Sequence, residues 1–247
     1  MKYREILPSE NLRPFIDAYW ILETDALHQP VSRIIYANGC TDIFVNKGNT
    51  IPDMNGIPFN TGVLYLGGTM TYSGVYNSVP NNLSIGIRFR PGGFSVFYNL
   101  PLFEAVDQVI EFPDSGLLNI LNPDELLADR LNVFFSAKIK NSRTIIPIVQ
   151  TVESFKGKIS VDALAKTHHL TRRTLERSFN ESIGITPKEF IKIMRFQEVL
   201  KKLRDRKHKE SLYYMAYEMG YYDHAHLANE VKRYSGLTPS GLIEYFA

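Results

Sequence analysis

The hydrophobic and polar positions of this chain follow two different periods. Up to about residue 90 the apolar residues form short runs that are rich in branched and aromatic side chains, and glycine and asparagine turns separate them. The runs span residues 31–36, 41–46, 62–66 and 83–90. In the last run apolar and polar residues alternate, which is typical of a strand with one buried face. The pattern predicts a β-rich N-terminal half, built as a small barrel or a sandwich.

Helical spacing replaces this alternation after residue 122. Asn122, Pro123, Asp124 and Glu125 supply a cap, a proline and two acids, so they predict a helix that ends near residues 138–140. Its apolar stripe consists of Leu126, Leu127, Leu131, Phe134 and Phe135. The stripe either covers the β-rich half or pairs with a second copy of the chain in a homodimer. Asn141, Ser142 and Arg143 mark the predicted boundary between a domain at 1–140 and a domain at 145–247.

One pattern occurs twice in the C-terminal half, with an offset of 52 residues. Thr171, Leu175, Phe179 and Gly184 correspond to Asp223, Leu227, Val231 and Gly236. Each copy predicts a short helix, a tight turn and a second helix that begins at a capping side chain, which together form a helix-turn-helix. Thr186, Pro187 and Glu189 predict the start of a connecting helix. Two such units on one face of DNA must lie about 34 Å apart to enter successive major grooves.

Long polar side chains occupy the helix faces opposite these apolar positions. The first copy carries Arg172, Arg173, Glu176, Arg177 and Asn180, and the second carries His224, Ala225, Asn229, Lys232 and Arg233. Arginine, asparagine and lysine are the side chains that contact base edges and phosphates in a major groove. A charge run is usually a solvated helix face, but here caps, turns, apolar spacing and the repeat all agree. The pattern therefore predicts double-stranded DNA as a partner.

The distribution of charge supports this prediction. The net charge is only +2, but the residues from Ile145 onward contain 17 Lys and Arg against 12 Asp and Glu. The preceding part contains 11 against 14. The basic half is the half that carries the repeat, which suits a polyanionic partner.

The C-terminal residues resemble the AraC/XylS family of transcriptional regulators. The resemblance rests on ISVDALA, on LTRRTLERSFNESIGITPKEF with Arg195 downstream, and on MAYEMGYYDHAHLANEVKRYSGLTPSGL. It implies an all-α domain of two helix-turn-helix units joined by a linker helix, in a bacterial regulator of transcription that contacts promoter DNA and RNA polymerase. It also implies that Arg173, Glu176 and Arg177 read bases in one half-site, and that His224, Ala225 and Asn229 hold the equivalent positions in the other.

Two positions depart from the family pattern. Asn229 stands where the family usually has arginine, and Ala225 stands where it often has serine. The second unit therefore either reads bases or binds phosphates alone.

The N-terminal half is similar to the cupin-like sensor domains of the same family, through residues 88–94 (RFRPGGF) and the pair Tyr19-Trp20. The resemblance implies an α+β protein with an N-terminal cupin-like β-barrel and flanking helices, which senses a small-molecule effector and dimerises. Six strand residues are candidates for lining the mouth of a barrel, and the alternative is that they are ordinary surface residues. They are Arg33, Tyr36, Asp42, Tyr65, Arg88 and Arg90.

The sequence argues against a metal, a cofactor or an enzyme activity. His28 is the one histidine of the N-terminal half, which is too few for a cupin metal site. We find no phosphate-binding glycine loop and no local nucleophile motif. A single cysteine, no membrane-length apolar run and no secretion signal at MKYREIL predict a cytoplasmic protein. The rival hypothesis is a cupin-like binding protein or enzyme whose helical half is an interaction module.

Overall fold

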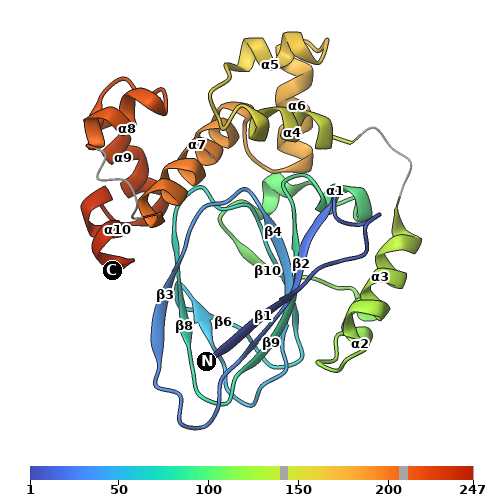
Figure 1. The fold of residues 1–247 in the computed structure, drawn as a ribbon. Helices are drawn as coiled ribbons and strands as arrows, with labels where there is room; N and C mark the ends of the chain where they lie inside the picture. The colour runs from blue at the N-terminus through green and yellow to red at the C-terminus, as the bar shows by residue number, and fades with distance from the viewer. Residues whose placement is uncertain (140–143, 206–210, 247) are drawn as a thin grey trace.

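A computed structural model describes residues 1–139, 144–205 and 211–246 of the chain. It has a mixed α+β fold, with a sheet domain at the N-terminus and a helical domain at the C-terminus (Figure 1). The predicted boundary at Asn141, Ser142 and Arg143 lies outside the described residues.

The strands form two antiparallel sheets. The larger has the order β1 (Lys2–Ile6), β2 (Ile16–Glu23), β9 (Leu83–Phe89), β4 (Thr41–Asn46), β7 (Leu64–Gly67) and β10 (Val109–Glu111). The smaller has the order β3 (Val31–Ile35), β8 (Gly74–Ser78), β5 (Asp53–Met54) and β6 (Ile57–Pro58).

The described strands do not form the closed barrel that the resemblance implies. The edge strand β1 pairs with β2 along one side and is solvent-exposed over most of its length. At the edge of the other sheet, β6 is two residues long and ends in Pro58, which has no N–H to donate to a neighbouring strand. The sheets therefore remain separate at these edges.

Helices cover the outer face of the larger sheet. They are α1 (Phe94–Phe97), the 3-10 helix η1 (Leu102–Ala105), α2 (Ser115–Ile120) and α3 (Leu127–Lys138). Ile85, Ile87 and Phe89 of β9 are fully buried in this layer, as the alternation predicts. Ser84 and Gly86 on the other face are buried too, so the prediction of a strand with one buried face is wrong. The ring of Phe89 packs edge-on against Phe135 of α3, with the ring centroids 5.6 Å apart.

Helix α3 begins four residues later than the cap and proline predict. Asp124 accepts a hydrogen bond from the Leu126 N–H instead, and it pairs with Arg130 at 2.8 Å. Leu127, Leu131 and Phe135 of the predicted stripe are buried in the core, whereas Phe134 is partly buried and Leu126, which precedes the helix, is exposed.

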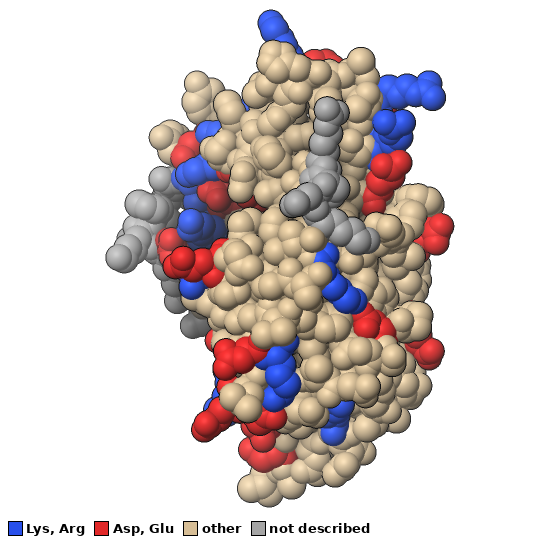
Figure 2. Space-filling view, turned by 90° about the vertical axis from the view of Figure 1, so that its right-hand side faces the viewer, with Lys and Arg blue, Asp and Glu red and all other residues tan. Residues whose placement is uncertain are grey.

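Figure 2 shows the flank of the molecule, where acidic and basic side chains are interspersed.

The helical domain contains two helix pairs joined by a long helix. The elements are α4 (Ile146–Ser154), α5 (Val161–Thr167), α6 (Arg172–Ser182), α7 (Pro187–Arg204), α8 (Leu212–Glu218), α9 (His224–Ser235) and α10 (Pro239–Tyr245). We call α5–α6 the first helix pair and α8–α9 the second. The two pairs lie on either side of α7 (Figure 1). None of the helices in the described ranges is both long and apolar enough to cross a membrane.

The two halves pack against each other. Ala37, in the loop after β3, belongs to the core of the helical domain, and its carbonyl accepts a hydrogen bond of 2.5 Å from Gln197 of α7. The buried Thr69 hydroxyl donates to the carbonyl of Ile183, at the end of α6, over 2.6 Å. The N-terminal half therefore touches both the long helix and the first helix pair.

Replacement of Leu131 by alanine tests the packing of α3 on the sheet. We expect Leu131→Ala to lower the free energy of unfolding by about 2–5 kcal/mol, because it leaves a cavity in a close-packed core. Val133→Ala is the matched control on the same helix, since the Val133 side chain is 72% exposed, and it should change stability by less than about 0.5 kcal/mol. Urea unfolding of the two variants measures both values, and equal losses would contradict this packing.

Candidate nucleic-acid interface and ligand cavity

The polar face of α6 is directed outward. The Thr171 side chain caps the helix by accepting a hydrogen bond from the Thr174 N–H at 3.1 Å. Leu175 and Phe179 are fully buried, so they fix the rotation of the helix about its axis. Arg173 and Arg177 are consequently exposed one turn apart on the opposite side.

The arginines of α6 differ in their partners. Arg172 pairs with Glu176 at 3.2 Å and lies 3.7 Å from Asp162 of α5. Within the described part of the chain, neither Arg173 nor Arg177 has an ion-pair partner. Both line a surface hollow together with Asn180 and with Phe103 of η1. Arg173 and Arg177 therefore have guanidinium groups that are free to bind another molecule.

The second helix pair has the same local plan. The Asp223 carboxylate caps α9 by accepting a hydrogen bond from the His226 N–H at 2.7 Å, and Leu227 and Val231 are fully buried. Four of the five predicted residues are exposed without an ion pair in the described ranges. These are His224, Ala225, Asn229 and Lys232. The predicted contact residue Arg233 instead forms an ion pair of 2.7 Å with Glu189 of α7.

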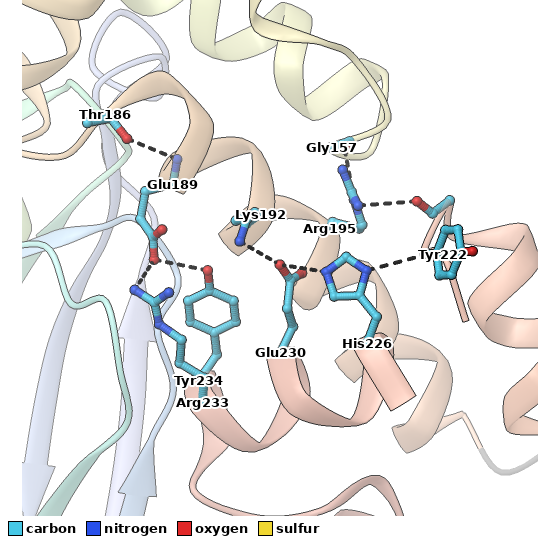
Figure 3. A network of polar contacts seen from close by, with 11 residues as sticks. Gly157, Thr186, Glu189, Lys192, Arg195, Tyr222, His226, Glu230, Arg233 and Tyr234 are labelled. Carbon is cyan, nitrogen blue, oxygen red and sulfur yellow. Dashed lines mark hydrogen bonds and ion pairs between the residues drawn. The ribbon is translucent and has the colours of Figure 1, made fainter. Parts of the chain in front are cut away.

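A polar network fastens α9 to α7 (Figure 3). Glu189 accepts a hydrogen bond from the Tyr234 hydroxyl at 3.0 Å in addition to its contact with Arg233. Glu230 is buried and lies 2.9 Å from the Lys192 ammonium and 3.5 Å from the His226 ring. Sequence analysis missed Lys192 and Glu230, because a salt bridge between two helices leaves no spacing pattern in the sequence.

Arg195 connects α7 to both helix pairs. Its Nε donates to the carbonyl of Gly157, before α5, at 3.2 Å, and its Nη1 donates to the carbonyl of Gly220, between α8 and α9, at 3.3 Å. The guanidinium also lies over the Tyr221 ring. One side chain thus binds the loop that leads into the first pair and the turn within the second, which restricts the relative orientation of the two pairs.

Two phenols in this region are kept neutral. Burial and the nearby Glu230 carboxylate raise the pKa of Tyr221, although Arg195 opposes the shift. Burial and Glu189 likewise raise the pKa of Tyr234. Both hydroxyls therefore remain protonated through the physiological range of pH.

A cavity of about 680 Å³ lies between the two sheets of the N-terminal half. Four of the six candidate ligand residues line it, namely Arg33, Tyr36, Asp42 and Arg88. Aromatic side chains that sequence analysis did not select make up much of the remaining wall. They include Trp20, Phe44 and Tyr76, and Arg204 of α7 also reaches the cavity.

The other two candidates lie outside the cavity lining. Tyr65 is buried and stacks on Phe44, and its hydroxyl accepts a hydrogen bond from the Asn60 N–H at 3.0 Å. Arg90 is at the surface, where it pairs with Asp17 at 2.9 Å. Arg90 lies beyond the end of β9, and Tyr65 packs against the rings of Phe44 and Phe59, which line the cavity in its place. Neither the end of the strand nor this packing can be read from alternation in the sequence.

The polar groups of the cavity are only partly satisfied. Asp42 accepts a hydrogen bond from the Trp20 indole at 2.8 Å and lies 3.6 Å from Arg88. Burial raises the pKa of the Asp42 carboxyl, and Arg88 opposes the rise. The hydroxyl of Tyr36 is buried, and no hydrogen-bond partner for it occurs among the residues that the structure describes. No group of three metal-ligating side chains occurs in the described ranges.

Removal of Lys192 tests the network between α7 and α9. We expect Lys192→Met to lower the free energy of unfolding by about 2 kcal/mol, because the buried Glu230 carboxylate loses its nearest cation. The double variant Lys192→Met, Glu230→Met should recover most of this loss, since it removes both charges. Lys188→Met, at an exposed position of the same helix, is the control and should be close to neutral. A double variant no more stable than Lys192→Met would contradict the coupling of these two side chains.

Comparison with known protein families gave two matches. Residues 4–111 match a domain of unknown function (DUF6597), and residues 164–244 match a helix-turn-helix domain. Comparison with curated proteins gave no match.

The fold is similar to that of ToxT from Vibrio cholerae. One ToxT structure is 13% identical and has a TM-score of 0.50, with 88% of this chain and 97% of ToxT covered. A ToxT structure bound to (E)-4-(8-methylnaphthalen-1-yl)but-3-enoic acid is 12% identical and has a TM-score of 0.51, with 89% and 99% covered. A probable AraC family transcriptional regulator from Rhodopseudomonas palustris is 22% identical, with 40% of this chain and 97% of that chain covered and a TM-score of 0.36.

The helix-turn-helix match agrees with the motif that is repeated on the two helix pairs. The chain therefore contains a helix-turn-helix domain over residues 164–244 and shares the fold of ToxT.

Proposed function

We propose that this protein binds promoter DNA through two helix-turn-helix units, the first and second helix pairs, and that the first unit reads bases. The observation that carries the proposal is the exposed, unpaired state of Arg173 and Arg177 on the face of α6 opposite Leu175 and Phe179. A guanidinium placed in this way can bind the two acceptors of a guanine edge in the major groove. Glu176, between them, can accept a hydrogen bond from cytosine, although Arg172 competes for it.

The second unit has fewer side chains that can form hydrogen bonds with bases than the first. Ala225 has no hydrogen-bonding side chain, and Arg233 is held by Glu189. Lys232 and Asn229 are exposed on α9, and His224 is exposed at its N-terminal end. We therefore assign phosphate binding chiefly to Lys232, and any base contact of this unit to His224 and Asn229.

We assign ligand sensing and DNA binding to different halves of the chain. Residues 1–140 form a cupin-like sensor and dimerisation domain, and residues 145–247 form the DNA-binding domain. Contact with RNA polymerase and formation of a homodimer belong to the same proposal, and both rest on the family resemblance.

Two substitutions separate base reading from phosphate binding. Arg177→Ala should weaken binding to the specific site by about 1–3 kcal/mol and relax discrimination at one base position. Lys232→Ala should weaken binding to specific and random duplexes alike, and should reduce the slope of log K against log salt concentration by about 1. Titrations of both duplexes at several salt concentrations measure these effects. If both variants lose specific and random binding equally, α6 is not the base-reading helix.

We further propose that the cavity between the sheets binds a small organic acid with an apolar body. Aromatic rings supply an apolar wall, and Arg33 and Arg204 have no carboxylate partner in the described part of the chain. The acid bound in one ToxT structure has a naphthalene body and a carboxylate. Arg204 belongs to α7, so a ligand at this end of the cavity would touch the helix that spaces the two units.

Binding of an aromatic acid should stabilise the full chain against heat. A ligand that binds only the folded state raises the free energy of unfolding by about 2.7 kcal/mol at a concentration one hundred times its Kd. With 1-naphthaleneacetic acid as probe, Arg33→Gln should reduce the upward shift in Tm. Arg4→Gln is the matched control, because Arg4 is exposed on the edge strand β1 and does not line the cavity. An equal shift in both variants would contradict a role for Arg33.

A further inference from the structure

Three tyrosines of the second helix pair point their rings into solvent. Tyr213 is 73% exposed, Tyr217 is 81% exposed and Tyr222 is 93% exposed, and we call these three residues the tyrosine rim. In the described parts of the chain none of their hydroxyls has a hydrogen-bond partner. Large aromatic side chains that are this exposed on one short segment are unusual for a protein that does not use them in binding.

The rim lies beside the N-terminal end of α9. Tyr222 immediately precedes Asp223, the residue that caps α9. Tyr213 and Tyr217 are one turn apart on α8, on the side away from the buried Met215 and Ala216. The rim is therefore continuous with the exposed face of α9 that begins at His224.

The internal repeat indicates where Tyr213 lies relative to the start of α9. Tyr213 is the second residue of α8, and the second residue of α5 is Asp162. Asp162 lies 3.7 Å from Arg172, the first residue of α6. By the equivalence of the two pairs, Tyr213 flanks the first residue of α9, which is His224.

The chemistry of the rim suits phosphate oxygens. A tyrosine hydroxyl can donate a hydrogen bond to a phosphate, and in a helix-turn-helix the first helix crosses the DNA backbone while the second enters the major groove. The corresponding residues of the first pair are Asp162, Lys166 and Leu170, which include no hydroxyl. The second unit thus presents three hydroxyl groups where the first presents a carboxylate, an ammonium group and an apolar side chain.

We propose that the tyrosine rim binds the DNA backbone beside α9, with each hydroxyl donating to a phosphate oxygen. The inference rests on the proposed function, and it deepens the role of the second unit. A hydroxyl carries no charge, so it releases no counterion from the DNA when it binds. The rim therefore supplies affinity that does not depend on salt concentration, whereas Lys232 supplies affinity that does.

Tyrosine-to-phenylalanine variants of the full chain test this, because they remove the hydroxyl and keep the ring. We expect the double variant Tyr213→Phe, Tyr222→Phe to bind duplex DNA about tenfold more weakly, with an unchanged slope of log K against log salt concentration. Adding Tyr217→Phe should weaken binding further. Tyr214→Phe, next to Tyr213 on the same helix but outside the rim, is the matched control and should bind as the wild type does.

The results that would contradict the tyrosine rim can be told apart from those that would contradict the proposed function. If the wild type binds duplex DNA and the triple phenylalanine variant binds equally well, the rim does not contact DNA, and a protein partner becomes the better assignment. A shallower salt slope in the triple variant would also overturn the proposal, because it would show a charge-linked effect. If the wild type binds no duplex at all, the proposed function fails together with the inference. Thermal melting of each variant excludes unfolding as the cause of weaker binding.

Discussion

The relative orientation of the two helix pairs depends on the contacts that α7 makes with each of them. Arg195 lies near the middle of α7 and donates to a carbonyl in the loop before α5 and to a carbonyl in the turn between α8 and α9. Glu189 and Lys192, on earlier turns of the same helix, bind side chains of α9. Because α7 is a single helix of 18 residues, these contacts fix α9 to a rigid rod. A protein that contacts two successive major grooves needs such a fixed spacing.

The same helix also joins the DNA-binding half to the cavity. Phe196 packs edge-on against Tyr36, which lines the cavity, and Gln197 binds the carbonyl of Ala37. Arg204, in the last turn of α7, lies over the Tyr36 ring. A ligand that moved Tyr36 would therefore act directly on the element that spaces the two units. If the proposed ligand binds in the cavity, these contacts are the route by which it would change DNA binding.

Local signals in the sequence were sufficient to predict most of the helical domain. The capping side chains Thr171, Thr186 and Asp223 all accept the hydrogen bonds that their positions predict. Capping depends on residues within one turn, so distant parts of the chain rarely override it. The buried Leu175, Phe179, Leu227 and Val231 follow from helical periodicity for the same reason.

Features that depend on distant contacts were not predictable in this way. Strands β1 and β2 are not among the runs that the sequence pattern predicted. Closure of the sheets depends on the partners of the edge strands, and the pairing of Arg233 with Glu189 joins residues 44 positions apart. The exposure of the tyrosine rim likewise depends on how α8 packs. A single sequence contains no periodic signal for such contacts.

The DNA sequences that the full chain selects from a pool of random duplexes test the central claim most directly. If α7 holds two units at a fixed spacing, the selected sites will contain two half-sites whose centres are about 10 base pairs apart, since that distance is one turn of DNA. Base preference should be stronger in the half-site contacted by α6. Selected sites with a single half-site, or with two half-sites at variable spacing, would contradict the account.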